Sequence, residues 1–174
     1  MLGATQEAFA ECAAFYRDTV LTPDVLDLYR VGLLFREPTY CDCTYKFGGF
    51  ARPHRYLIIS SSLKCLDEYS QHPEWGLCIG PRDRIFKVIG RHERDGKAQV
   101  TLLEIPEDLV GEFTTQTLSE TEEAFAEQAA EAFEAALDMP PLAEHSTTIW
   151  LERLEYPVGV DDDGHFFQAW QADG

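Results

Sequence analysis

Lysine and arginine are missing from a long part of this sequence, since neither occurs between Ala98 and Glu152. Residues 1–97 carry 13 basic and 13 acidic side chains, so the net charge of −17 arises entirely in residues 98–174. Such a surface repels nucleic-acid phosphates and anionic lipids, and it attracts cations. We therefore expect no nucleic acid and no membrane to bind the acidic half. A basic protein is the expected partner, although such a charge also serves solubility.

Long hydrophobic runs are absent too, and no apolar stretch approaches the roughly 20 residues that a membrane-spanning helix needs. The first eleven residues contain two glutamates and no basic side chain, which is unlike a secretory signal. Five cysteines, an odd number without the spacing of small disulfide proteins, favour reduced thiols. We predict a cytoplasmic protein with a single globular domain over residues 1–174.

The common catalytic signatures are absent as well. The sequence has no Gly-x-Ser-x-Gly, no His-Glu-x-x-His and no set of kinase motifs, and its five histidines are scattered. It contains neither the phosphate-binding P-loop nor the dinucleotide fingerprint, so no cofactor is predicted. These absences favour a protein that is not an enzyme, although a site assembled only in three dimensions stays open.

The clearest element that is present is a helix from Ser119 to Asp138. Ser119 with Glu122 forms a capping box, and Pro140-Pro141 ends the helical pattern. One predicted face is apolar and includes Phe125 and Phe133. The opposite face is an acidic stripe of Glu120, Glu123, Glu127, Glu131 and Glu134. This stripe is the predicted partner-binding surface.

Other segments predict further elements around this helix. Apolar spacing over residues 5–20 and a Thr22-Pro23-Asp24 start signal predict a pair of N-terminal helices. Strands are expected over residues 41–47, 55–60, 77–79 and 147–151, the last with a helix as the alternative. The fold class is therefore α+β, with a mostly antiparallel sheet of about five to seven strands.

The turn signal Asp95-Gly96 predicts a hairpin between two β-rich runs. Folding the chain about this turn pairs Val88 with Leu103 and Lys87 with Glu104. A second turn signal, Asp163-Gly164, predicts a terminal hairpin that pairs Val160 with Phe167. This turn explains the acids of residues 161–163 better than a calcium loop does.

A glycine- and arginine-containing loop is the alternative ligand site. Glycines allow a backbone to approach a ligand, and guanidinium groups suit phosphate or carboxylate. The predicted ligand-binding residues are Gly48, Gly49, Arg52, His54 and Arg55. The simpler interpretation is a hairpin loop whose arginines pair with the protein's own acids.

Two cysteines, Cys41 and Cys43, lie at a spacing that places both on one face of a strand. With Cys65, Cys78 or a histidine they could share a metal ion, but the paired Cys-x-x-Cys signature of zinc sites is missing. Cysteine is also a frequent small core residue. We predict no metal.

Together these features favour a small acidic protein that acts by protein–protein interaction through its acidic half, as an inhibitor, an immunity-type protein, or an assembly or regulatory factor. The alternatives are an anion or small-molecule binding module that uses the glycine-arginine loop, and an enzyme with its site in the first half.

Overall fold

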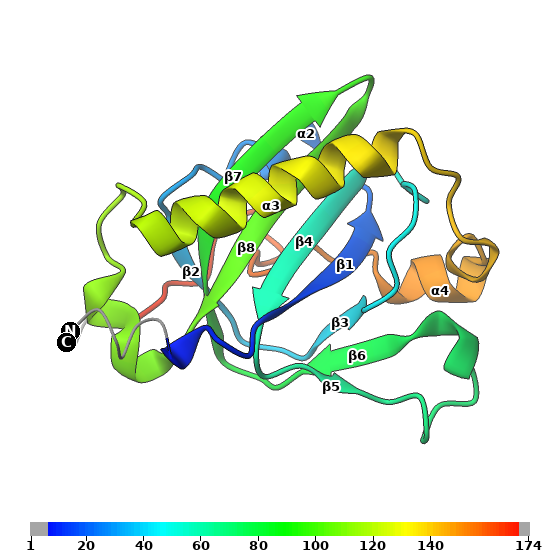
Figure 1. Ribbon diagram of the computed structural model, residues 1–174, viewed down its shortest axis with the longest axis horizontal. Helices are drawn as coiled ribbons and strands as arrows, with labels where there is room; N and C mark the ends of the chain where they lie inside the picture. The colour runs from blue at the N-terminus through cyan, green and yellow to red at the C-terminus, as the bar shows by residue number, and fades with distance from the viewer. Residues whose placement is uncertain (1–6, 171–174) are drawn as a thin grey trace.

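The computed structural model describes residues 7–170, which build one eight-stranded sheet with helices on its surfaces (Figure 1). The strand order is β2-β7-β8-β4-β1-β3-β6-β5, and only the β4–β8 pair is parallel. The strands are β1 (Ala13–Thr19), β2 (Leu34–Glu37), β3 (Cys41–Thr44), β4 (His54–Ser60), β5 (Lys64–Cys65), β6 (Leu77–Gly80), β7 (Arg84–Arg94) and β8 (Lys97–Ile105). The predicted α+β class with a mostly antiparallel sheet is confirmed, but the strands number eight rather than five to seven.

The helices between and after these strands are mostly short. They are α2 (Pro23–Leu26), η1 (Pro73–Trp75), η2 (Glu107–Glu112), α3 (Glu120–Leu137), η3 (Ala143–His145) and α4 (Thr148–Arg153). Within residues 7–170, no helix has both the length and the apolar character needed to cross a membrane.

The predicted pair of N-terminal helices is wrong. Residues 13–19 form β1, which pairs with β4 along its whole length and with β3 on its other side. Sheet partners on both sides outweigh the helical spacing of a few apolar residues. The second helix is only the four residues of α2, although Thr22 caps it and Pro23 begins it as predicted.

The strands over residues 41–44 and 54–60 do not form the expected hairpin, because β1 lies between them. The loop from Gly48 to Pro53 therefore crosses over β1. The strand expected over residues 147–151 is also wrong: the helix given as its alternative is present as α4, with Thr147 at the N-cap position. Residues 64–65 form the edge strand β5.

The Asp95-Gly96 hairpin is confirmed, but half of its predicted register is not. Near the turn the pairs are as expected, for example His92 with Gln99. A β-bulge between Val88 and Gly90 then shifts the pairing by one residue, so that Lys87 lies opposite Leu103. One extra residue in β7 is enough to change every later partner.

The long helix α3 begins at the predicted capping box, in which Ser119 and Glu122 exchange both hydrogen bonds. It lies diagonally across the face of the sheet formed by β7 and β8 (Figure 1). Ala129 and Phe133 are buried on its inner side, where Ala129 packs in one apolar cluster with Leu103 and Ile89 of the sheet. The predicted apolar face is thus confirmed.

A buried ion pair fixes α3 to the sheet. Lys87 Nζ of β7 lies 2.7 Å from Glu122 Oε1, and both side chains are at most 2% exposed. Because of the bulge, Lys87 lies opposite the apolar Leu103 and not opposite Glu104. Its ammonium group pairs with Glu122 of α3. A buried charge without its partner is strongly destabilising.

The other face of the sheet is covered by the end of the chain. Val158, Val160 and Phe166 pack against sheet residues such as Phe35 and Phe86. The Asp163-Gly164 turn is present, with Gly164 at a φ of 81°, but Val160 pairs with Phe166 and not with Phe167. The sheet is therefore enclosed between α3 and a non-helical C-terminal segment, residues 155–169.

Replacing Glu122 by glutamine should lower the free energy of unfolding by about 3–5 kcal/mol, because the ammonium of Lys87 stays buried without a counter-charge. Urea denaturation measures this change. The matched control is Glu123→Gln on the exposed side of the same helix, for which we expect a change within about 0.5 kcal/mol. Equal losses for the two variants would contradict a structural role of the ion pair.

Candidate functional site

A groove of about 530 Å³ opens between β3 and the C-terminal segment. We call it the Arg17 groove. It is lined by Arg17, Glu37, Thr39, Tyr40, Cys41, Asp42, Arg153, Tyr156, Pro157, Val158, Val160, Asp161, Asp162 and Phe167. These residues come from β1, from the stretch that runs from the end of β2 to the start of β3, and from the last twenty residues described. It is therefore assembled only when the two ends of the chain meet.

Arg17 is the buried cation of this groove and is 6% exposed. Its Nη1 donates to the carbonyl of Asp42 at 2.8 Å, and its Nη2 donates to the carbonyl of Tyr156 at 2.7 Å. Its Nε has no hydrogen-bond partner among the described residues. A buried donor without an acceptor is costly, so this N–H is a donor that the described protein atoms leave unsatisfied.

Glu37 at the end of β2 fixes the loop beside the groove. Its carboxylate accepts hydrogen bonds from the amide of Thr39 at 2.9 Å, from the hydroxyl of Thr39 at 2.6 Å and from the amide of Gly159 at 2.6 Å. Gly159 has a φ of 71°, and a Cβ there would lie 2.1 Å from the ring of Phe35. Only glycine fits this position, so the segment is held tightly.

Two buried tyrosines hold the backbone of the C-terminal segment at Val158. Tyr29 donates to the carbonyl of Val158 at 2.7 Å, and its hydroxyl lies 2.7 Å from that of Tyr56. The amide of Val158 in turn donates to Tyr56. Burial raises the pKa of both phenols, so they remain neutral donors at ordinary pH.

The rim of the groove is aromatic and acidic. Tyr40 and Tyr156 are 65% and 74% exposed, and Phe167 is 38% exposed. Asp161 accepts two backbone hydrogen bonds within its own turn, whereas the carboxylate of Asp162 has no partner in the described chain. Aromatic faces and free carboxylates both attract cations and hydroxyl donors.

The charges of the groove do not balance. Two arginines and four carboxylates line it, which leaves a formal excess of two negative charges. Arg153 pairs with Asp42 at 2.8 Å, so these two charges compensate each other. The groove consequently disfavours phosphate groups and favours neutral or cationic ligands.

Cys41 contributes a thiol to the groove, but not a reactive one. Burial raises its pKa to about 11. The thiolate is the nucleophilic form of cysteine, so a neutral thiol at pH 7 is a poor nucleophile. The chemistry of the groove is therefore hydrogen bonding and electrostatics.

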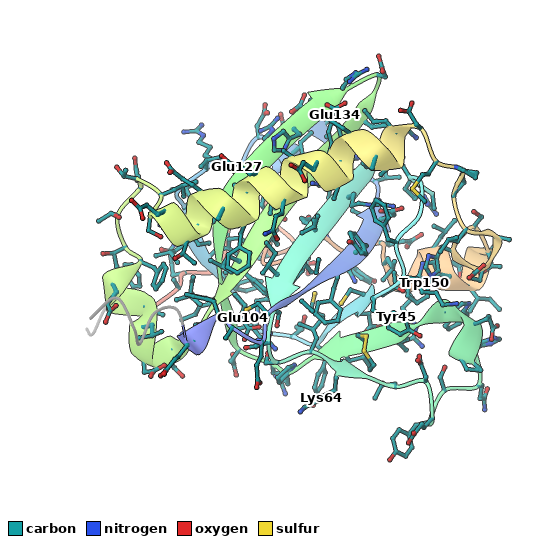
Figure 2. The ribbon with its side chains drawn as sticks, in the orientation of Figure 1. Tyr45, Lys64, Glu104, Glu127, Glu134 and Trp150 are labelled. Carbon is teal, nitrogen blue, oxygen red and sulfur yellow. A yellow bond between two sulfur atoms is a disulfide. The ribbon has the colours of Figure 1, made fainter. Side chains whose placement is uncertain are left out.

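The predicted acidic stripe lies far from this groove. All five of its glutamates are exposed on the outer side of α3, and Figure 2 shows Glu127 and Glu134 along that helix. Glu134 forms an ion pair with Arg94 of β7. The stripe is thus partly compensated by a basic residue that lies 40 positions earlier in the chain.

The glycine-arginine loop is largely self-contained. Arg55 is buried and donates to both oxygens of Asp18, at 2.6 and 2.9 Å, and to the carbonyls of Gly48 and Gly49. His54 accepts the amide of Leu21 at Nδ1, and burial lowers its pKa. Arg52 is half-buried beside Glu155. The guanidinium of Arg55 therefore pairs with Asp18 of the same chain.

The cysteines form a disulfide that contradicts the expectation of reduced thiols. Cys65 and Cys78 are bonded across β5 and β6, because these adjacent strands place the two residues directly opposite each other. Cys41 and Cys43 are buried and free. Among residues 7–170, no cluster of three or more histidine, cysteine, aspartate or glutamate side chains is placed to hold a metal.

Sequence reasoning missed the central residues of the groove. Arg17, Glu37 and Tyr156 belong to no motif and are far apart in the chain. The only available signal was the Arg17-Asp18 pair, two charges inside a run of aromatic and β-branched residues. A charged residue in such a strand is either at an edge or in a buried polar cluster.

No family model and no curated protein matches this sequence. Solved structures with similar folds include the ADP-ribosyltransferase HopU1 of Pseudomonas syringae, which is 19% identical with a TM-score of 0.48 over 54% of this chain and 45% of that one. Exoenzyme S of Pseudomonas aeruginosa, described in complex with a human 14-3-3 protein and bound to carba-NAD, is 13% identical with a TM-score of 0.49. That match covers 71% of this chain and 63% of exoenzyme S.

The C3 exoenzyme of Clostridium limosum is also similar, at 14% identity and a TM-score of 0.46 over 55% of this chain and 60% of that one. This chain therefore spans about half to two thirds of the length of these proteins. At these values the similarity concerns the fold, and no residue role or substrate is transferred.

The prediction of a non-enzymatic interaction protein is contradicted by this comparison, because the similar solved structures include ADP-ribosyltransferases. Acidic composition misled the sequence-based interpretation: it reports how the surface is solvated, and it carries no information about a groove assembled from distant residues.

Replacing Tyr29 by phenylalanine should cost about 1–3 kcal/mol, because the carbonyl of Val158 is left buried without a donor. Denaturant unfolding measures the loss, and amide hydrogen exchange at residues 156–160 should increase. The matched control is Tyr45→Phe, which removes the hydroxyl that donates to Asp67 at the surface. A Tyr29 variant as stable as this control would show that the hydroxyl does not fix the segment.

Proposed function

We propose that this protein acts on a nucleoside-type small molecule bound in the Arg17 groove. The observation that carries the proposal is the buried, unpartnered Nε–H of Arg17 in a groove with exposed aromatic rings and free carboxylates at its rim. Ligand sites are typically concave and mainly apolar, with a few polar groups that fix orientation.

Each part of the groove matches one part of such a ligand. A ring carbonyl or carboxamide oxygen accepts from Arg17 Nε. The planar ring lies against Tyr40 or Tyr156, and ribose hydroxyls donate to Asp161 and Asp162. A cationic ring gains further from the aromatic faces and from the excess negative charge.

Nicotinamide riboside combines all of these features, with a cationic ring, a carboxamide and free hydroxyls. It is the nucleoside part of NAD, and NAD or its carba analogue is named for two of the similar structures. The proposal rests on the residues of the groove and would stand without that similarity.

A binding series separates the contributions of ring, hydroxyls and phosphate. In calorimetric titrations of the full chain, nicotinamide riboside should bind with the highest affinity, adenosine with a lower affinity and adenosine monophosphate with the lowest. The monophosphate is last because its phosphate dianion meets the excess negative charge of the groove. Thermal stabilisation by the same compounds should follow the same order. Equal affinity for adenosine and its monophosphate, or no binding of either nucleoside, would refute the proposal.

Rim variants test the position of the ligand without disturbing the core. Tyr156→Leu should weaken nicotinamide riboside by roughly 2- to 30-fold, the equivalent of about 0.5–2 kcal/mol for a cation on an aromatic face. Asp162→Asn should weaken it several-fold. The matched control is Asp163→Asn, since Asp163 is the neighbouring exposed acid that does not line the groove. Parallel losses in the two aspartate variants would place the ligand elsewhere.

A further inference from the structure

Three cysteines form a row across three neighbouring strands at one edge of the sheet. Cys43 of β3 lies directly opposite Cys78 of β6, and Cys78 lies directly opposite Cys65 of β5. Residues directly opposite in adjacent strands project to the same face of a sheet. Cys78 is bonded to Cys65, whereas Cys43 is free.

Cys43 lies opposite Cys78 just as Cys65 does, on the other neighbouring strand. Opposed residues of antiparallel strands have Cα atoms about 4.5–5.5 Å apart, and disulfides form at Cα separations of about 4.4–6.8 Å. The Sγ of Cys43 already contacts the backbone carbonyl of Cys78 at 3.6 Å. A Cys43–Cys78 bond therefore needs no change in strand register.

The order of the three strands matches the order of the three sulfur atoms in an exchange. A thiolate displaces a disulfide sulfur in line with the bond that breaks, through attack on the central sulfur. Here the attacking, central and leaving sulfurs belong to three successive strands, with the cysteine of β6 in the middle. Attack on Cys78 from the side of β3 expels Cys65 toward the outer edge.

We propose that Cys43 is an internal exchange partner of the Cys65–Cys78 disulfide and that Cys65 is a surface thiol-modification site. The thiolate of Cys43 forms a bond to Sγ of Cys78, the Cys78–Cys65 bond breaks, and its electron pair leaves on Cys65. The proton lost by Cys43 goes to solvent, and Cys65 takes one up when it is protonated. No oxidant or reductant is consumed.

The exchange transfers the free thiol from the buried Cys43 to the exposed Cys65. Cys43 is fully buried, whereas Cys65 is exposed on β5, the last strand of the sheet. A free thiol at Cys65 is accessible to alkylating reagents and to low-molecular-weight disulfides, which the thiol of Cys43 is not. The edge of the sheet is therefore where a thiol-reactive molecule would act.

The local environment makes this exchange slow at neutral pH. Burial raises the pKa of Cys43 well above its usual value, and Cys41 and Asp42 of the same strand act in the same direction. Arg17 of β1 and Arg84 of β7 oppose them. Because only the thiolate attacks, the exchange rate should rise about tenfold per pH unit between pH 7 and pH 9.

Alkylation of the native, full-length chain tests the proposal. The protein is incubated with N-ethylmaleimide at pH 8.5, stopped in acid at successive times and digested with pepsin at low pH without reduction. Mass spectrometry should find modified Cys65 increasing together with a Cys43–Cys78 linked peptide, and both should appear about tenfold more slowly at pH 7.5.

Cysteine variants give the matched comparison. In Cys43→Ala, modified Cys65 should be absent, whereas in Cys41→Ala, which removes a buried thiol two residues away that faces Gly80, it should still form, and no more slowly than in the natural sequence, because Cys41 raises the pKa of Cys43. Cys43→Ser provides a second variant, and circular dichroism checks that each variant is folded. Modified Cys65 in a folded Cys43 variant overturns the proposal, as does failure of the Cys43–Cys78 peptide to form in the natural sequence.

Discussion

The buried guanidinium of Arg17 is the interaction on which the arrangement of the site depends. It starts from β1 in the interior of the sheet, and its two hydrogen bonds reach the backbone of Asp42 and that of Tyr156, 139 positions away. A guanidinium buried without acceptors would be too costly to keep. The C-terminal segment therefore has to cross this face of the sheet, and the groove is the space between that segment and β3.

Buried ion pairs, rather than the exposed acidic surface, determine how the layers meet. Lys87 and Glu122 connect α3 to β7, and Arg55 with Asp18 fixes the loop that crosses β1. Each pair is nearly inaccessible to solvent. An arrangement of the layers that separated the two charges would leave each buried without a partner, so the pairs disfavour such arrangements. The acidic stripe on α3 faces water on the opposite side of the sheet from the groove, which separates solubility from ligand binding.

Local signals in the sequence predicted the elements that depend on neighbouring residues. The capping box of α3, the Thr22 cap and the Asp95-Gly96 turn were predicted correctly because each is decided within a few positions. The helix expected over residues 13–19 was wrong, because pairing with β4 and β3 decides that segment. The bulge at residues 88–90 was not foreseeable either. It accompanies the ion pair between Lys87 and Glu122, which lie 35 positions apart in the sequence.

The site was less predictable than the fold for the same reason. Its donor, its carboxylates and its aromatic rim come from three separated segments, and none has a spacing that marks it. The glycine-arginine loop had the composition of an anion site, but the donors of Arg55 are occupied by Asp18 and two carbonyls. Composition identifies groups that are able to bind, whereas only the folded chain reveals which of them remain free.

The most direct measurement of the central claim is an NMR titration that follows the Nε–H signal of Arg17. On addition of nicotinamide riboside, this signal and the amides of Tyr40 and Asp162 should shift together and saturate with one dissociation constant. Shifts confined to α3 or to residues 48–55, or no shift of the Arg17 signal at saturation, would contradict the assignment of the groove as the functional site.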